Sequence, residues 1–147
     1  LAGSGGTRSL PINDFLLDRG RTDRRDDEVL TAVRFSKPPD ASATAFLKGG
    51  RRKAMEISVV CVAAYLAANG KGYTKARIAI GAAASRTFRA VAAEQLVTDG
   101  GSFAEAGRLA SEAAAPIDDV RASARYRRLL VAALVERALM RCRERLP

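Results

Sequence analysis

The period of the hydrophobic pattern changes once along this sequence, near Ser85, and this change limits the possible folds more than any other feature. Before Ser85, apolar residues alternate or run without interruption, as in strands, over 57–68 and 75–85. After it, they recur at helical spacing, and residues that cap or end helices separate the segments. Strands followed by helices predict an α+β domain, in which helices pack on one side of an antiparallel sheet.

Three segments are predicted to form a three-stranded antiparallel sheet. Residues 28–35 alternate as a strand does, and the prolines that follow end it because proline lacks the N–H that a ladder needs. Residues 57–68 begin with β-branched side chains and are apolar on both faces, which predicts a strand buried between layers. The Asn-Gly-Lys-Gly sequence at 69–72 predicts a hairpin turn into 75–85. We expect the glycine-broken basic stretch 45–56 to be a loop or a short turn.

Three helices are predicted to follow the sheet. The first ends at a pair of glycines, and Ser102 with Glu105 fits a capping box at the start of the second. Asp118 or Asp119 is placed to cap a last helix that extends to about Arg143. The stripes predicted to be buried are Phe88, Val91, Ala92, Gln95 and Leu96 on the first helix, and Leu130, Val131, Leu134, Val135, Ala138, Leu139 and Cys142 on the last.

The length of 147 residues fits one domain with a single core. The first residues, LAGSGGTRSL, lack an initiator methionine and the charged and apolar regions of a signal peptide. We therefore expect 1–6 to be a Gly/Ser linker or a cut end and 7–147 to form the domain. No window approaches about 18 uninterrupted apolar residues, so we expect no membrane-spanning segment.

The residue types restrict the chemistry. The sequence contains no histidine, which removes histidine-based acid–base and triad chemistry. Cys61 and Cys142 are the only cysteines, and a zinc or iron–sulfur site needs more ligands than these two. We interpret them as reduced core thiols of a cytoplasmic protein.

The net charge of +9 raises the question of a nucleic-acid partner. The basic residues are scattered over the whole length, many of them beside acidic residues, and no helix-turn-helix, finger or ribonucleoprotein motif accompanies them. A surface that meets acidic partner subunits, or a bound dinucleotide, accounts for the charge equally well.

Four stretches carry a resemblance to a known family. In order, they are Arg8–Phe15 with Asp27–Leu30, then Phe46–Ile57, then Ile78–Ala82 with Arg89-Ala90 and Glu94, and finally Asp119–Arg127. Each motif alone is unspecific, but together they span about residues 7–140 in a shared order. They resemble the C-terminal domain of the FAD-binding (medium) subunit of the xanthine dehydrogenase and aerobic carbon monoxide dehydrogenase family of molybdenum hydroxylases.

The resemblance implies a component of an oxidoreductase that is not active alone. In the family, substrate is oxidised at a molybdenum centre, electrons pass through iron–sulfur clusters, and FAD delivers them to an acceptor. In the family, FAD is held mainly by an N-terminal FAD-binding domain, which we expect to be absent from this sequence, and the 2Fe–2S clusters and the molybdenum cofactor belong to partner subunits. Gly49-Gly50 and Gly100-Gly101 do not match the family's pyrophosphate-binding turns between a strand and a helix. We expect this domain to cover one side of the flavin and to dock to the iron–sulfur and molybdenum subunits.

Two residues are candidates for flavin contact on the strength of this resemblance. Lys48 matches a lysine that lies near the flavin ring in the family, where an ammonium would stabilise the negative charge of reduction. Without the resemblance, Lys48 is a solvated loop lysine in a basic stretch. Leu30 matches an aliphatic position beside the isoalloxazine, and its alternative is an ordinary strand residue in the core.

The remaining motif residues have structural interpretations. Arg51 and Arg52 could bind a phosphate or an acidic partner, or form an ion pair with Glu56 or Asp27. In the fourth motif we expect Asp119 to cap the helix, Arg121 to pair with a carboxylate, and the ring of Tyr126 to pack while its hydroxyl finds a partner.

The sequence departs from the family pattern at two places. Ala82 stands where the family tends to have a glycine, and Ser85-Arg86-Thr87 replaces a Thr-Pro pair. We interpret both as matters of backbone fit.

Two rival functions remain beside the flavin-subunit hypothesis. One is a free-standing assembly module that keeps the fold and lacks flavin chemistry. The other is a nucleic-acid binder, which rests on charge alone and predicts strongly salt-dependent retention on DNA or RNA.

Overall fold

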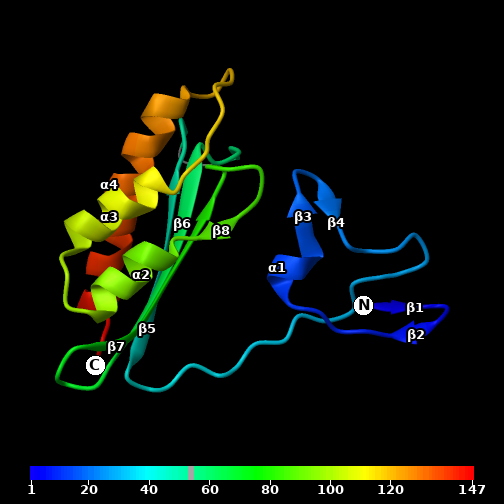
Figure 1. Cartoon of the computed structure of the whole chain (residues 1–147), viewed down its shortest axis with the longest axis horizontal. Helices are drawn as coiled ribbons and strands as arrows, with labels where there is room; N and C mark the ends of the chain where they lie inside the picture. Colours follow the sequence, from blue (N-terminus) through cyan, green and yellow to red (C-terminus); the bar gives the residue numbers. More distant parts are fainter. Residues whose placement is uncertain (53–54) are drawn as a thin grey trace. The chain divides into compact units, whose positions relative to one another are not determined.

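The computed structural model describes residues 1–52 and 55–147. The chain consists of two compact units, Leu1–Pro38 and Pro39–Pro147, and each is described by itself. The larger unit contains an antiparallel sheet and three helices, as predicted (Figure 1).

The sheet of the larger unit has four strands in the order β5-β6-β7-β8. Their bounds are Ser42–Gly49 for β5, Val60–Ala68 for β6, Tyr73–Gly81 for β7 and Phe88–Arg89 for β8. The predicted hairpin between β6 and β7 is confirmed, and Gly70 in its turn has a φ of 79°, which glycine adopts without strain. The predicted alternation along β7 is confirmed as well, because Ala76, Ile78 and Ile80 are buried.

The prediction of a strand over 28–35 is wrong, and β5 takes its place. Val33 and Phe35 are exposed, so the alternating side chains of this segment are not packed in a core and do not hold it in a sheet. β5 lies within the stretch that we expected to be a loop. It pairs with β6 over its whole length, and its core-facing residues are Ala43, Ala45 and Leu47. The alternation is faint in the sequence because two of these three residues are alanines with little apolar area.

Three helices cover one face of this sheet (Figure 1). They are α2 (Val91–Thr98), α3 (Phe103–Glu112) and α4 (Ala124–Glu144). α4 packs on β5 and β6, α2 packs on β7, and α3 packs on both other helices. The stripe predicted for α4 is confirmed, with Leu130 only partly buried. α3 and α4 approach closely at Gly107, where an added Cβ would lie 2.5 Å from the backbone oxygen of Ala132.

The predicted first helix needs correction at its start. Phe88 belongs to β8, where it pairs with Ile80, and α2 begins only at Val91. As a result, α2 buries Ala93, Glu94 and Val97 instead of the predicted stripe.

The caps of the later helices agree only in part with the predictions. The Ser102 hydroxyl accepts the N–H of Glu105 at 3.1 Å, as expected. The N-cap of α4 is Ser123, because its side chain accepts the N–H of Tyr126. Asp118 still contributes, since its carboxylate accepts the N–H of Ala124 at 2.6 Å.

The smaller unit consists of two short hairpins and one helical turn. Their bounds are Ala2–Gly3 for β1, Gly6–Thr7 for β2, Ile12–Phe15 for α1, Leu16–Asp18 for β3 and Arg21–Thr22 for β4. Residues 1–6, which we expected to be a linker or a cut end, take part in the first hairpin, and Leu1 is buried. The expected boundary at residue 7 therefore falls inside this hairpin.

Candidate functional site

Lys48 lies on β5, on the face of the sheet that the helices do not cover. Along β5, Ala43 and Ala45 face the helices and are buried, whereas Phe46 and Lys48 face the other way and are exposed. The Lys48 ammonium donates a hydrogen bond to the backbone carbonyl of Glu56. This bond orients the side chain and uses one of the three donors that an ammonium carries.

The uncovered surface, which we call the open face, consists of side chains in rows that cross β5, β6 and β7. Phe46 is 64% exposed, and its neighbours across the sheet, Ala63 on β6 and Ala79 on β7, carry only methyl groups. The middle of the open face is therefore flat and apolar. A shallow hollow of about 590 Å³ lies over part of it. The rows are Thr44-Tyr65-Arg77, Phe46-Ala63-Ala79 and Lys48-Cys61-Gly81.

A buried carboxylate organises the basic border of the open face. Glu94 accepts the Nε of Arg89 and the backbone N–H of Ile78, both at 2.9 Å, and lies 3.6 Å from the Nη1 of Arg77. It therefore extends the hydrogen bonding of β7 beyond the end of β8, and it raises the pKa of Arg89. The sequence singled out Arg89 and Glu94 as motif residues but did not predict that Glu94 is buried.

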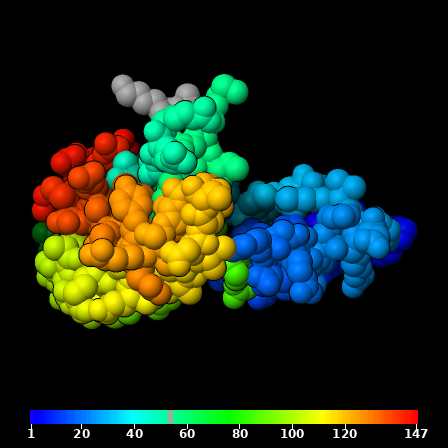
Figure 2. All heavy atoms as spheres, turned by 90° about the horizontal axis from the view of Figure 1, so that it is seen from above, coloured from blue at the N-terminus to red at the C-terminus, as the bar shows by residue number. Residues whose placement is uncertain are grey.

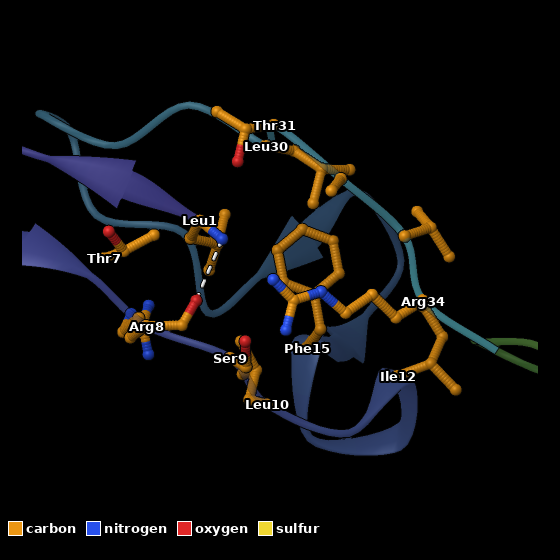
Figure 3. A pocket seen from close by; sticks show the side chains of 12 residues that line it. Leu1, Thr7, Arg8, Ser9, Leu10, Ile12, Phe15, Leu30, Thr31 and Arg34 are labelled. Atoms are coloured by element: carbon orange, nitrogen blue, oxygen red, sulfur yellow. Dashed lines mark hydrogen bonds between the residues drawn. The ribbon is translucent and has the colours of Figure 1, made fainter. Parts of the chain in front are cut away.

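Leu30 belongs to the smaller unit and lines a pocket there. It is 49% exposed and follows an isolated bridge between Val29 and Ala2, so it is not the core strand residue of the alternative interpretation. The pocket has a volume of about 270 Å³. Figure 3 shows Leu30 at this pocket, together with Phe15 and Arg34. The structure thus describes Lys48 and Leu30 in separate units, and the flavin role of both stays a prediction.

An arginine–carboxylate cluster holds the smaller unit together beside this pocket. Arg8 donates its Nε and Nη2 to the two oxygens of Glu28 at 2.6 and 2.8 Å, and its Nη1 to Asp23 at 2.6 Å. The hydrogen bond from Arg8 is the main reason why the pKa of the buried Glu28 falls to about 2. Sequence reasoning missed this cluster, although Arg8 and Glu28 stand in the two parts of the first motif.

Arg52 makes hydrogen bonds to neighbouring residues of its own loop instead of either predicted ion pair. The Glu56 carboxylate accepts the backbone N–H of Arg52, whose guanidinium donates to the carbonyl of Met55 at 3.1 Å. Asp27, the other predicted partner, accepts the hydroxyl of Ser4 at 2.5 Å.

The fourth motif contains a buried arginine that sequence reasoning did not anticipate. Arg127 is 3% exposed, and its Nη1 donates to the carbonyls of Val59 at 2.8 Å and Ala82 at 2.9 Å. Its Nη2 donates to the carboxylate of Asp119 at 2.7 Å. Asp119 therefore anchors Arg127 and does not cap the helix.

Two other expectations for this motif have mixed outcomes. Arg121 pairs with Asp119 at 2.7 Å, as predicted. The ring of Tyr126 is exposed and does not pack in the core, because the buried stripe of α4 runs along another side of the helix.

Neither glycine pair lies between a strand and a helix. Gly49 ends β5 and the next element is β6, whereas Gly100 and Gly101 join α2 to α3. In the described part of the chain, no three His, Cys, Asp or Glu side chains come together as metal ligands. Among the same residues, no helix has the length and hydropathy needed to cross a membrane.

Comparison with known proteins identifies relatives of one kind. A family model described as the CO dehydrogenase flavoprotein C-terminal domain matches residues 45–142. A putative xanthine dehydrogenase FAD-binding subunit of Escherichia coli is 34% identical over 91 residues, which are 61% of this chain and 31% of that protein. The chain thus matches less than a third of the length of this curated relative.

Solved structures give the same result for the fold. A chain of the carbon monoxide dehydrogenase from Hydrogenophaga pseudoflava, in a form that lacks the molybdenum-pyranopterin moiety of its cofactor, has a TM-score of 0.93 at 24% identity. This likeness covers 99% of this chain and 52% of that chain. For a chain of the quinoline 2-oxidoreductase from Pseudomonas putida, the TM-score is 0.88 at 31% identity, with coverage of 97% and 50%.

Proposed function

Because the chain belongs to the family of CO dehydrogenase flavoprotein C-terminal domains, we propose that it is the C-terminal part of the FAD-binding subunit of a molybdenum-hydroxylase-type oxidoreductase. In this role the domain covers one side of the flavin and docks to the iron–sulfur and molybdenum subunits. The FAD-binding subunits of Escherichia coli among its relatives support the proposal.

The observation that carries the proposal is that Phe46 and Lys48 are exposed side by side on the open face, two positions apart in β5. FAD, when bound, supplies the redox chemistry by taking up electrons and passing them on. The open face suits a planar aromatic ring, because Phe46 offers an exposed aromatic surface and Ala63 and Ala79 beside it have only methyl groups. Phe46 lies within the second motif, and its alternation with Lys48 was the signal that could have found it.

Lys48 would act electrostatically on a ring that lies against this face. Its ammonium is already oriented by the carbonyl of Glu56, so little reorganisation is needed when negative charge develops nearby. A unit charge at about 4 Å contributes about 1 to 4 kcal/mol, depending on how much water lies between the charges. For a two-electron couple this free energy corresponds to roughly 20 to 90 mV.

The test is the Lys48→Met substitution in the complete FAD-binding subunit, with Lys71→Met in the β6–β7 hairpin as the matched control. We expect Lys48→Met to lower the midpoint potential of the flavin by roughly 20 to 90 mV, and Lys71→Met to leave it unchanged. Equal potentials in all three proteins would contradict the role of Lys48.

A second measurement separates the proposal from the assembly-module alternative. The N-terminal FAD-binding domain should hold flavin more tightly when this chain is added to it. Binding of the partner subunits with no effect on flavin affinity would favour the module without flavin chemistry.

A further inference from the structure

The carbonyl that orients Lys48 belongs to a residue whose side chain is held in place as well. The Lys48 ammonium donates to the backbone carbonyl of Glu56, and the carboxylate of Glu56 accepts the backbone N–H of Arg52. A carbonyl orients an ammonium and leaves its positive charge in effect, whereas a carboxylate in the same place would largely cancel that charge. Figure 2 shows the described residues around these bonds, in blue-green, where they project from the larger unit.

Gly50 provides the space that the Glu56 carboxylate occupies. A Cβ added to Gly50 would lie 2.6 Å from Oε2 of Glu56, which is closer than real Cβ atoms come to other heavy atoms. The φ of Gly50 does not lie in the left-handed region, so its backbone conformation does not require a glycine. The absence of a side chain at Gly50 therefore serves to admit the carboxylate.

The residue before Glu56 has a strained backbone. Met55 has a φ of 52°, in the left-handed region, which is unfavourable for a side chain with a Cβ. Met55 is 94% exposed, so packing does not account for this conformation. The guanidinium of Arg52 donates to the carbonyl of Met55 at 3.1 Å, and the N–H of Arg52 donates to the Glu56 carboxylate. These two bonds from Arg52 hold the strained residue and the carboxylate together.

The Glu56 carboxylate therefore controls where the Lys48 ammonium lies. Without the carboxylate, the N–H of Arg52 loses its acceptor and the carbonyl of Glu56 is no longer held. The flexible four-carbon chain of Lys48 then regains the rotamers that its hydrogen bond excluded. An ammonium that spends part of its time farther from the flavin ring, with water between them, stabilises negative charge on that ring less.

We propose that Glu56 is a positioning residue for reduction of the flavin. Its carboxylate, which Gly50 admits, fixes the carbonyl that orients Lys48, and it thereby raises the midpoint potential of the flavin although it carries a negative charge itself. This inference rests on the proposed function and adds a residue that acts on the flavin through Lys48.

The experiment measures the midpoint potential of the flavin in the complete FAD-binding subunit. Glu56→Ala removes a negative charge, which by itself would raise the potential, whereas the loss of Lys48 orientation lowers it. We expect the equilibrium constant for flavin reduction to fall about three- to tenfold, which is roughly 14 to 30 mV for a two-electron couple. Glu56→Gln keeps an oxygen that can accept the N–H of Arg52, so its potential should be equal to or above that of the unmodified protein.

A second variant displaces the carboxylate without changing any charge. Gly50→Ala should lower the potential in the same direction as Glu56→Ala, because the added Cβ pushes the carboxylate away. The matched control is Gly5→Ala, where an added Cβ meets nothing within 4 Å, and it should leave the potential unchanged. In a protein that already carries Lys48→Met, neither Glu56→Ala nor Gly50→Ala should lower the potential further.

The outcomes separate this inference from the proposed function. A potential of the Glu56→Ala protein above that of the unmodified protein would overturn the positioning role, because the carboxylate would then act only through its charge. An unchanged potential in the Gly50→Ala protein would overturn it too. If Lys48→Met lowers the potential in either case, the role of Lys48 stands and only the role of Glu56 fails. If Lys48→Met has no effect, both fail.

Discussion

Replacing Ala82 by glycine should stabilise the protein. Ala82 has a φ of 62°, in the left-handed region, and its carbonyl accepts the Nη1 of the buried Arg127 at 2.9 Å. This bond holds the residue in a conformation that is unfavourable for any side chain with a Cβ. Because Ala82 is exposed, its methyl group contributes little to packing, and the substitution removes strain without opening a cavity.

The magnitude follows from two opposing terms. A left-handed conformation costs about 1 to 2 kcal/mol for an L-residue, and glycine removes this strain. Glycine also gives the unfolded chain more freedom, which offsets about 0.4 to 1 kcal/mol. The midpoints of these ranges give a rise of about 0.8 kcal/mol in the free energy of unfolding, between limits of about 0 and 1.6 kcal/mol. For a unit of this size, that rise corresponds to a melting temperature higher by roughly 2 to 6 °C.

The assay is urea and thermal unfolding followed by circular dichroism, with Ala104→Gly as the control. Ala104 is also exposed but lies in α3, so its replacement should lower the free energy of unfolding by about 0.5 to 1 kcal/mol. Ala82→Val should be destabilising as well, since a β-branched side chain tolerates positive φ poorly. Loss of stability in both glycine variants would refute the assignment of strain to Ala82.

Three further predictions concern packing and protonation. Gly107→Ala should lower the free energy of unfolding by about 1–2 kcal/mol in urea melts, because overpacking against the backbone of α4 exceeds the gain in helix propensity. Burial raises the pKa of Cys142 to about 11, so its thiol should resist a thiol reagent in the folded protein at pH 8 while Cys61 reacts. The folded pKa lies above the reference value of 9.0, so stability should fall in unfolding curves as pH rises from 9 toward 11. Glu28, whose folded pKa is lowered from 4.5 to about 2, should stabilise the smaller unit above pH 4.5 and lose this effect toward pH 2, and Arg8→Gln should raise the midpoint of acid unfolding.

The strands with strong apolar signals could be predicted from the sequence, and β5 could not. Ile78 and Ile80 define an alternation that only one register satisfies. The fully buried residues of β5 are alanines, which occur on both exposed and buried faces and so carry little positional information, and Leu47 is the one large side chain on that side. The glycines and basic residues after it made the stretch resemble a loop.

The buried charges could not be predicted, because their partners are distant in the sequence. Arg127 donates to the carbonyl of Val59, which is 68 positions away in the sequence. Every residue has a backbone carbonyl, so the sequence does not show which one an arginine will bind. Glu94 is buried because a basic border and a strand N–H converge on it in space. The prediction of a flavin role for Lys48 came only from the resemblance, since an exposed lysine on a strand looks the same as any solvated lysine.

The strand order has a consequence for how this protein behaves outside a larger assembly. β5 is an edge strand of eight residues, which is long because proteins usually keep exposed edge strands short. Two outward groups of β5 have partners, because the guanidinium of Arg145 donates to the carbonyl of Thr44 at 2.8 Å and the N–H of Ser42 donates to the carbonyl of Asp40 at 2.8 Å. The other outward N–H and C=O groups along β5 offer a template for a strand of another molecule. The isolated chain should therefore tend toward edge-to-edge self-association, which a proline placed in the edge would suppress.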